Sequence, residues 1–344
     1  CAEVETTGYA GFSFDGENRS PSSLIKLDGS AVFFLAGLQN MGVKPLEECS
    51  LEEARATMES FKMMQLPPPG DVSVVDTQYP IEGGYRTARL YRPSVDGPLP
   101  VVVFLHGGGW IGGSLDSFDE PCATLASRTG ALVVSPDYRL APEHPFPAAT
   151  DDTVAVLRWA ADHIAEFGGD PDRMAVGGES AGANLAAVAA LRLRDEGGPS
   201  LRAQVLVTPP TDFLADNESR KAFAHGPILS MELAMRMGSQ YLGDPANTMS
   251  PWASPARASD LSGLPPALVI TMEIDPSRDE AEDYASALAA AGVPTVCRRF
   301  DGLFHTAFSL SGAIPRVADI QTAIADFLAP LLSTETATAA AAIG

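Results

Sequence analysis

The sequence predicts a fold of the α/β class, with a mostly parallel, doubly wound sheet of about eight strands. From residue 71 onward, short stretches rich in valine and other apolar residues alternate with longer segments that have helical spacing. Several short stretches are apolar throughout, which is typical of strands that are buried on both faces. Strands that alternate with helices form crossover connections, and these connections produce a parallel sheet.

Eight stretches are expected to be strands: Val72–Tyr79, Tyr85–Tyr91, Pro100–Leu105, Ala131–Ser135, Met174–Gly177, Ala203–Thr208, Ala267–Met272 and Thr295–Phe300. Apolar residues that recur at helical spacing predict the helices between and after them. These are expected at Asp151–Phe167, Asn184–Arg194, Asp279–Ala291 and Ala313–Leu332. An earlier helix is expected to begin at Ser50, which forms a capping box with Glu53.

Composition divides the chain into a main domain and three other parts. Residues 1–70 are expected to form an N-terminal arm and a cap segment, and residues 71–332 the α/β domain. Residues 211–260, which contain a helical pattern at Met231–Leu242, are too long for a simple crossover and indicate a functional insertion. Residues 333–344 have the composition of a flexible tail.

The charge balance argues against several classes of partner. The chain has 23 Lys and Arg against 44 Asp and Glu, a formal net charge of −21. Such a surface repels phosphate backbones and anionic membranes, so neither nucleic acid nor a membrane surface is an expected partner. No apolar run is long enough to span a membrane, and the first residues lack the pattern of a signal peptide.

Four scattered cysteines indicate neither a disulfide framework nor a zinc site. We therefore expect no metal and a cytoplasmic location.

The segment Gly178-Glu179-Ser180-Ala181-Gly182 has the pattern G-x-S-x-G between an expected strand and an expected helix. A serine on such a tight turn projects its hydroxyl above the sheet, which makes Ser180 a candidate nucleophile. A phosphate-binding turn is the alternative interpretation. It is disfavoured because neither G-x-G-x-x-G nor G-K-[ST] is present.

The run His106-Gly107-Gly108-Gly109-Trp110 follows an expected strand. Consecutive glycines leave backbone N–H groups free to bind the negative oxygen that forms during acyl transfer. We expect Gly107 and Gly108 to serve this role. Ala181, at the start of a helix, would supply a further N–H. His106 is expected to be structural.

A serine nucleophile needs a histidine base and an acid. His305 follows the last expected strand, where a loop can bring it to the sheet edge. Asp275 follows the preceding strand and is fixed by Pro276, and the order Ser, Asp, His is the one this chemistry has in α/β folds. Asp279 and Glu280 are better explained as charges in the first turn of the next helix.

These motifs, together with Asp137-Tyr138-Arg139-Leu140-Ala141-Pro142-Glu143, resemble those of the bacterial hormone-sensitive-lipase family (family IV) of esterases. The resemblance runs from about residue 24 to residue 332. It implies an α/β-hydrolase core, a cap built from the N-terminal segment and the insertion, no cofactor, and a monomer or homodimer. Two positions depart from the family pattern: Glu179 replaces the usual Asp, and Thr306 stands where the family has Gly after the histidine.

The sequence therefore predicts a carboxylesterase that hydrolyses small, short- to medium-chain esters with Ser180, His305 and Asp275. An amide hydrolase or deacetylase with the same triad is an alternative. Another alternative is a ligand receptor on the same fold, such as the plant gibberellin receptor, which lacks the catalytic histidine. This alternative is disfavoured because His305 is present at the expected place. Flexible methionines in the two cap segments are expected either to line an adaptable pocket or only to pack cap against core; they are Met58, Met63, Met64, Met231, Met235 and Met237.

Overall fold

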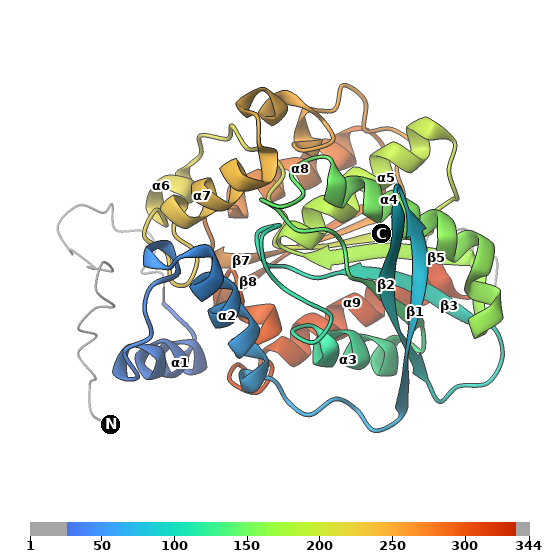
Figure 1. Ribbon diagram of the computed structural model, residues 1–344, viewed down its shortest axis with the longest axis horizontal. Helices are drawn as coiled ribbons and strands as arrows, with labels where there is room; N and C mark the ends of the chain where they lie inside the picture. The colour runs from blue at the N-terminus through green and yellow to red at the C-terminus, as the bar shows by residue number, and fades with distance from the viewer. Residues whose placement is uncertain (1–25, 335–344) are drawn as a thin grey trace.

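An eight-stranded sheet crosses the molecule, with helices packed on both of its faces (Figure 1). The computed structural model describes residues 26–334. The strands are β1 (Val72–Ile81), β2 (Gly84–Pro93), β3 (Leu99–Leu105), β4 (Leu132–Pro136), β5 (Gly169–Glu179), β6 (Ala203–Val207), β7 (Ala267–Ile274) and β8 (Thr295–Phe304). Each predicted strand is present.

The sheet is mostly parallel, as predicted. Its strand order is β1-β2-β4-β3-β5-β6-β7-β8. The β1–β2 and β2–β4 pairs are antiparallel, whereas every pair from β4–β3 to β7–β8 is parallel. The carboxyl ends of β3 and β5 to β8 therefore lie at one edge of the sheet, and the loops that leave them can meet there.

The central strands are apolar on both faces because both faces carry a hydrophobic core. In β3, Val101 and Val103 belong to one buried cluster, and Val102 and Phe104 belong to the other. This alternation follows from the two-residue repeat of a strand. It explains why β3 reads as a continuous apolar run in the sequence.

Helices fill the two layers beside the sheet. Figure 1 shows α4 (Ala148–His163), α5 (Ala181–Glu196) and α8 (Arg278–Ala290) on one side, and α3 (Asp119–Thr129) and α9 (Val317–Leu332) on the other. The sequence predicted all of these except α3. Short 3₁₀ helices are present at Leu46–Glu48, Phe61–Met64, Ile164–Phe167, Pro245–Met249, Pro255–Arg257 and Ala307–Ser309.

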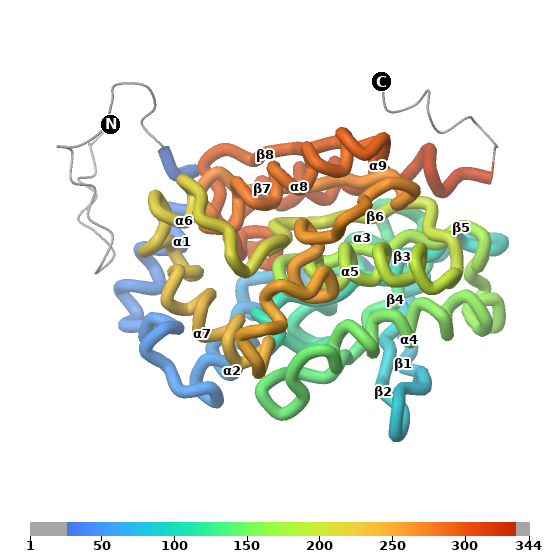
Figure 2. Tube along the Cα trace, turned by 90° about the horizontal axis from the view of Figure 1, so that it is seen from above, coloured from blue at the N-terminus to red at the C-terminus, as the bar shows by residue number. Residues whose placement is uncertain are grey.

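Two segments far apart in the sequence gather at one end of the sheet in both views (Figures 1 and 2). We call residues 26–66 and 211–260 the covering segments. The first carries α1 (Gly29–Asn40) and α2 (Leu51–Ser60), and the second carries α6 (Glu218–Ala222) and α7 (Met231–Leu242). The capping box predicted at Ser50 is present at the start of α2. Arg236 of α7 joins the segments by donating hydrogen bonds to the carbonyls of Leu46 and Cys49, each at 2.8 Å.

Within residues 26–334, no helix has the length and apolar character needed to cross a membrane. Residues 1–25, which begin the predicted N-terminal arm, lie outside the described residues, as do residues 335–344 of the predicted tail.

Candidate active site

Ser180 lies on the sharp turn between β5 and α5. Its φ of +54° is one that residues with a side chain rarely adopt, and such a conformation costs roughly 1–3 kcal/mol. The Ser180 N–H donates to the Val207 carbonyl at 2.8 Å, which anchors the turn on β6. A Cβ on Gly182 would lie 2.2 Å from the Leu105 carbonyl oxygen, so only glycine lets α5 approach β3 this closely.

The structure brings His305 and Asp275 to Ser180. The Ser180 Oγ lies 2.7 Å from His305 Nε2, and His305 Nδ1 lies 2.8 Å from Asp275 Oδ2. His305 sits directly after β8 and Asp275 directly after β7, so the adjacent strand ends place both. Both side chains are buried. A proton on the Ser180 hydroxyl can therefore pass to an imidazole whose other nitrogen is held by a carboxylate.

Ser277 also belongs to this arrangement, and the sequence did not indicate it. Its N–H and its hydroxyl both donate to Asp275 Oδ1, at 2.8 and 2.7 Å. The two oxygens of the Asp275 carboxylate thus have different partners, one held by His305 and the other by Ser277. This fixes the plane of the carboxylate, and with it the orientation of the imidazole.

Three backbone N–H groups, those of Gly107, Gly108 and Ala181, lie in the glycine loop and at the start of α5, beside Ser180. Among the described residues, no acceptor is bonded to the N–H of Gly107 or Gly108. Ala181 is the first residue of α5, where a helical N–H has no acceptor within the helix. Gly107 and Gly108 line the same cavity as Ser180 and His305. These donors are available to a negative oxygen that forms beside Ser180.

His106 is buried beneath this glycine loop. Its Nδ1 lies 2.7 Å from the Gly107 carbonyl oxygen, and its ring stacks on Tyr138 with centroids 4.3 Å apart. The Tyr138 hydroxyl donates to the His106 carbonyl at 2.9 Å. Burial, the largest influence, lowers the pKa of His106, so the ring stays neutral at neutral pH.

A cavity of about 160 Å³ holds these groups. Its walls include residues from both covering segments, among them Gln65 of the first and Phe213 of the second. Four of the methionines that the sequence singled out line the cavity, namely Met58, Met231, Met235 and Met237. Met63 is 77% exposed and does not contribute to it. The expectation that methionines line a pocket is thus met by four residues.

Comparison with known proteins identifies the family. The α/β hydrolase fold family matches residues 102–309. A carboxylic ester hydrolase of Mycobacterium tuberculosis, LipN, is 41% identical over 297 residues, which are 85% of this chain and 77% of LipN. A thermostable esterase from Pseudomonas putida has a similar structure, with a TM-score of 0.86 and 35% identity over 91% of this chain and 100% of that one. The chain belongs to the hormone-sensitive-lipase group of α/β-hydrolase esterases. It is a carboxylesterase, as predicted.

The ethyl acetate hydrolase of Pseudomonas putida is another relative of this esterase. It is 36% identical over 244 residues, which are 69% of this chain and 76% of the relative.

One departure from the family pattern, Glu179, places a buried carboxyl beside the site. It is 3% exposed, and a Cβ added to Gly107 would lie 1.8 Å from its Oε2, so the carboxyl packs directly on the glycine loop. Burial is the main cause that raises the pKa of Glu179 to about 7; the cationic form of His305 opposes the shift and Asp275 adds to it. The carboxyl of Glu179 therefore changes between its protonated and its ionised form near neutral pH.

The second departure, Thr306, is accommodated without strain. Its φ of −87° is a value that any residue adopts, so glycine is not required after His305. Thr306 lines the cavity.

The electrostatics of His305 favour its cation more than in a free histidine. Burial is the largest influence and would lower its pKa, but the charge of Asp275 and the hydrogen bond to it outweigh burial. The net result is a pKa raised above its usual value of 6.5.

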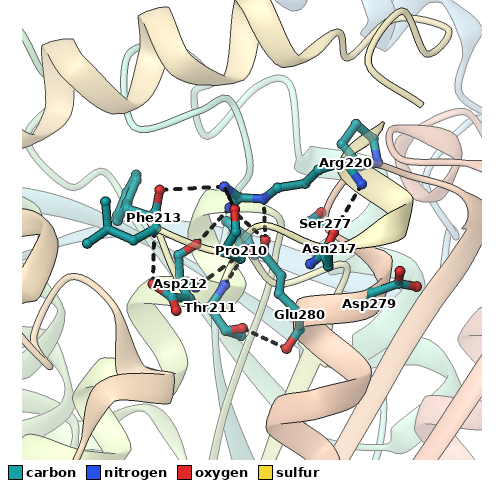
Figure 3. Close-up of polar contacts among 12 residues, drawn as sticks. Pro210, Thr211, Asp212, Phe213, Asn217, Arg220, Ser277, Asp279 and Glu280 are labelled. Carbon is teal, nitrogen blue, oxygen red and sulfur yellow. Dashed lines mark hydrogen bonds and ion pairs between the residues drawn. The ribbon is translucent and has the colours of Figure 1, made fainter. Parts of the chain in front are cut away.

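Asp279 and Glu280 occupy the first turn of α8, as predicted, but each also has a specific partner in the second covering segment. The Asp279 carboxylate accepts from the Ser219 N–H at 2.7 Å. Glu280 is buried and pairs with Arg220 of α6 at 2.6 Å (Figure 3). Its other oxygen accepts from the Thr211 N–H at 3.0 Å. Sequence reasoning missed these links because the partners are far apart in the chain.

Proposed function

We propose that this carboxylesterase works through an acyl-enzyme on Ser180. His305 accepts the proton from Ser180 as the hydroxyl attacks the ester carbonyl, and Asp275 stabilises the resulting imidazolium. His305 then gives the proton to the departing alcohol. In the second half of the reaction, His305 removes a proton from water, which attacks the acyl-enzyme and releases the acid.

The N–H groups of Gly107, Gly108 and Ala181 are proposed to bind the oxyanion in both halves. Donors of this kind stabilise charge that exists only in the transition state, which is why each contributes strongly to the rate.

One observation carries the proposal: the unbroken series of contacts from Ser180 Oγ to His305 Nε2 and from His305 Nδ1 to Asp275, inside a cavity that small molecules can occupy. Ser180 also has a positive φ, and strained backbone conformations of this kind concentrate at functional sites.

We further propose that the covering segments act as a cap that restricts the substrate to short or medium acyl chains. The cavity of about 160 Å³ is close to the size of an engineered protein cavity of roughly 150 Å³ that holds benzene. A group of that size corresponds to a short acyl chain. The ethyl acetate hydrolase among the relatives supports the same range.

A panel of p-nitrophenyl esters with graded acyl chains tests this proposal. We expect the highest kcat/KM between acetyl and hexanoyl esters, with little action on long-chain triglyceride emulsions. A maximum at decanoyl or longer chains would contradict the cap's role. Matched p-nitroanilides in the same assay test the amide-hydrolase alternative, since comparable turnover of anilides would favour it.

We also propose a cytoplasmic location, which free thiols support. Cys49, Cys122 and Cys297 are free cysteines in this structure, as expected in a reducing compartment. The homodimer stays a prediction, which light scattering during size-exclusion chromatography tests.

A further inference from the structure

A tight turn in the second covering segment has an unusual centre. The Leu229 N–H donates to the Pro227 carbonyl at 2.8 Å, which closes a three-residue turn around Ile228. Ile228 has a φ of +66°. Three-residue turns with positive φ are rare and strained, and a β-branched residue is among the least suited to this conformation.

The strained turn lies at the boundary between two cavities. Ile228 lines the cavity that contains Ser180, and it also lines a smaller hollow of about 20 Å³. Leu46 and Phe61 line both spaces as well, so these three side chains form a shared wall. The hollow is also bordered by Lys44, which is exposed, so it lies close to the protein surface.

Ile228 differs from the other two wall residues in how it is held. Leu46 belongs to one of the two hydrophobic clusters and Phe61 to the other, and both are buried. Ile228 is partly buried and packs against the edges of both clusters. Its side chain thus fills the gap where the two cores meet, and the strained backbone aims it there.

The frame around this turn is rigid on the side of α6. The guanidinium of Arg220 pairs with Glu280 at 2.6 Å and donates to the carbonyls of Asp212 and Ala215 at 2.7 and 2.9 Å (Figure 3). On the other side, the Met231 N–H donates to the Ala224 carbonyl at 2.9 Å. This bond joins the two ends of residues 224–231, and Phe223 and Leu229 on either side of Ile228 are buried, so protein contacts hold the turn in place.

We propose that Ile228 is a specificity-determining residue that closes the substrate cavity toward this hollow and so limits the length of the apolar arm of the ester. The inference rests on the proposed function, because it assigns the cavity at Ser180 to the substrate. With a smaller side chain at position 228, the cavity and the hollow join, and a longer apolar chain extends through the gap toward the surface near Lys44.

The test compares Ile228→Ala with variants that leave the wall intact. Leu229→Ala enlarges only the cavity, because Leu229 lines the cavity and not the hollow. Thr57→Ala enlarges only the hollow, because Thr57 lines the hollow and not the cavity. Each protein is assayed on p-nitrophenyl acyl esters from acetate to dodecanoate, and on alkyl acetates with graded alcohol chains.

The measured quantity is the ratio of kcat/KM for the decyl-length substrate to that for the butyl-length substrate, in each series. Both values come from one preparation, so the ratio does not depend on the fraction of protein that is folded. Each buried methylene changes kcat/KM by roughly 10–200-fold in an apolar site. We therefore expect Ile228→Ala to raise the ratio at least about tenfold in one of the two series. Thr57→Ala should leave it near the wild-type value, and Leu229→Ala, which enlarges the cavity without opening it toward the hollow, should raise it less than Ile228→Ala does.

Ile228→Gly is a second test that does not depend on how well the alanine variant folds, because glycine adopts positive φ without strain. It should raise the ratio as alanine does. Unchanged ratios in both series for both variants, with acetate hydrolysis retained, would overturn the role of Ile228 and leave the proposed function intact. Loss of ester hydrolysis from the wild-type protein itself would instead contradict the proposed function.

Discussion

Replacing Glu179 by glutamine should make the protein more stable at alkaline pH and have much less effect at acidic pH. Glutamine keeps the shape of the protonated carboxyl but cannot ionise. Glu179 is buried against Gly107, and burial raises its pKa from 4.5 to about 7. The folded protein therefore holds this proton more tightly than the unfolded chain does.

The size of the effect follows from the two pKa values. Below pH 4.5 both states carry the proton, and Glu179 adds no pH dependence. Between 4.5 and about 7 the unfolded chain ionises while the folded protein does not, so the free energy of unfolding falls as pH rises. At one pKa unit per 1.36 kcal/mol, the full loss above pH 7 is roughly 3 kcal/mol. About 2 kcal/mol of it develops between pH 5.5 and 8.

Urea unfolding of the wild type and of Glu179→Gln at pH 5.5 and at pH 8 measures this effect. Glu179→Gln should increase the free energy of unfolding by about 2 kcal/mol more at pH 8 than at pH 5.5. Glu282→Gln is a control, because the pKa shift of Glu282 has the opposite sign. Burial raises the pKa of Glu282, but hydrogen bonds from Arg299 and Thr271 lower it more, so its net pKa is below the usual value. At pH 5.5 and at pH 8 this carboxyl is ionised in both the folded and the unfolded protein, so the stability that Glu282→Gln loses should be the same at both pH values. An equal effect of Glu179→Gln at both pH values would show that folding does not raise the pKa of this carboxyl.

Three further predictions concern the site and its supports. Asp275→Asn should lower kcat by about 10⁴-fold because it favours the wrong imidazole tautomer, whereas Asp279→Asn should mainly reduce stability. Steady-state kinetics of the two variants measure this, and a larger loss of kcat in Asp279→Asn would contradict the choice of Asp275. Because His305 must be neutral to act as base and its pKa is raised, kcat/KM should rise with pH to a midpoint above about 6.5; a flat profile down to pH 4.5 in folded protein would exclude a histidine base. Arg220→Met leaves Glu280 buried without its partner and should lower the free energy of unfolding by about 3–5 kcal/mol. A double variant that also carries Glu280→Gln should recover part of this loss. A loss below about 1 kcal/mol in thermal or urea unfolding would show that the pair does not support the fold.

The strands and the Ser180 turn could be predicted because their signals are local. β3 is apolar along its length since both of its faces are buried, and Gly182 is glycine because a backbone carbonyl occupies the space of its Cβ. Residues that meet such local requirements can be recognised without knowledge of the tertiary contacts.

Other features depend on contacts that the sequence does not reveal. Arg220 and Glu280 are 60 residues apart, and no pattern in either segment indicates that they pair. Ser277 follows Asp275-Pro276, and a serine is common in such a turn. Its hydrogen bonds to Asp275 become evident only in the folded turn. α3 begins with charged residues and Pro121, so its apolar face was not evident as a helical pattern. Ile228 is the extreme case, because its conformation is one that isoleucine disfavours in isolation.

The central claim is that Ser180 carries the acyl group. The direct measurement is mass spectrometry of the protein after treatment with a p-nitrophenyl organophosphate, followed by peptide mapping. We expect one adduct, on Ser180, formed in step with the loss of esterase activity. A folded Ser180→Ala variant should form no adduct, and its turnover should be lower by several orders of magnitude. An adduct on another residue, together with activity retained by Ser180→Ala, would contradict this claim.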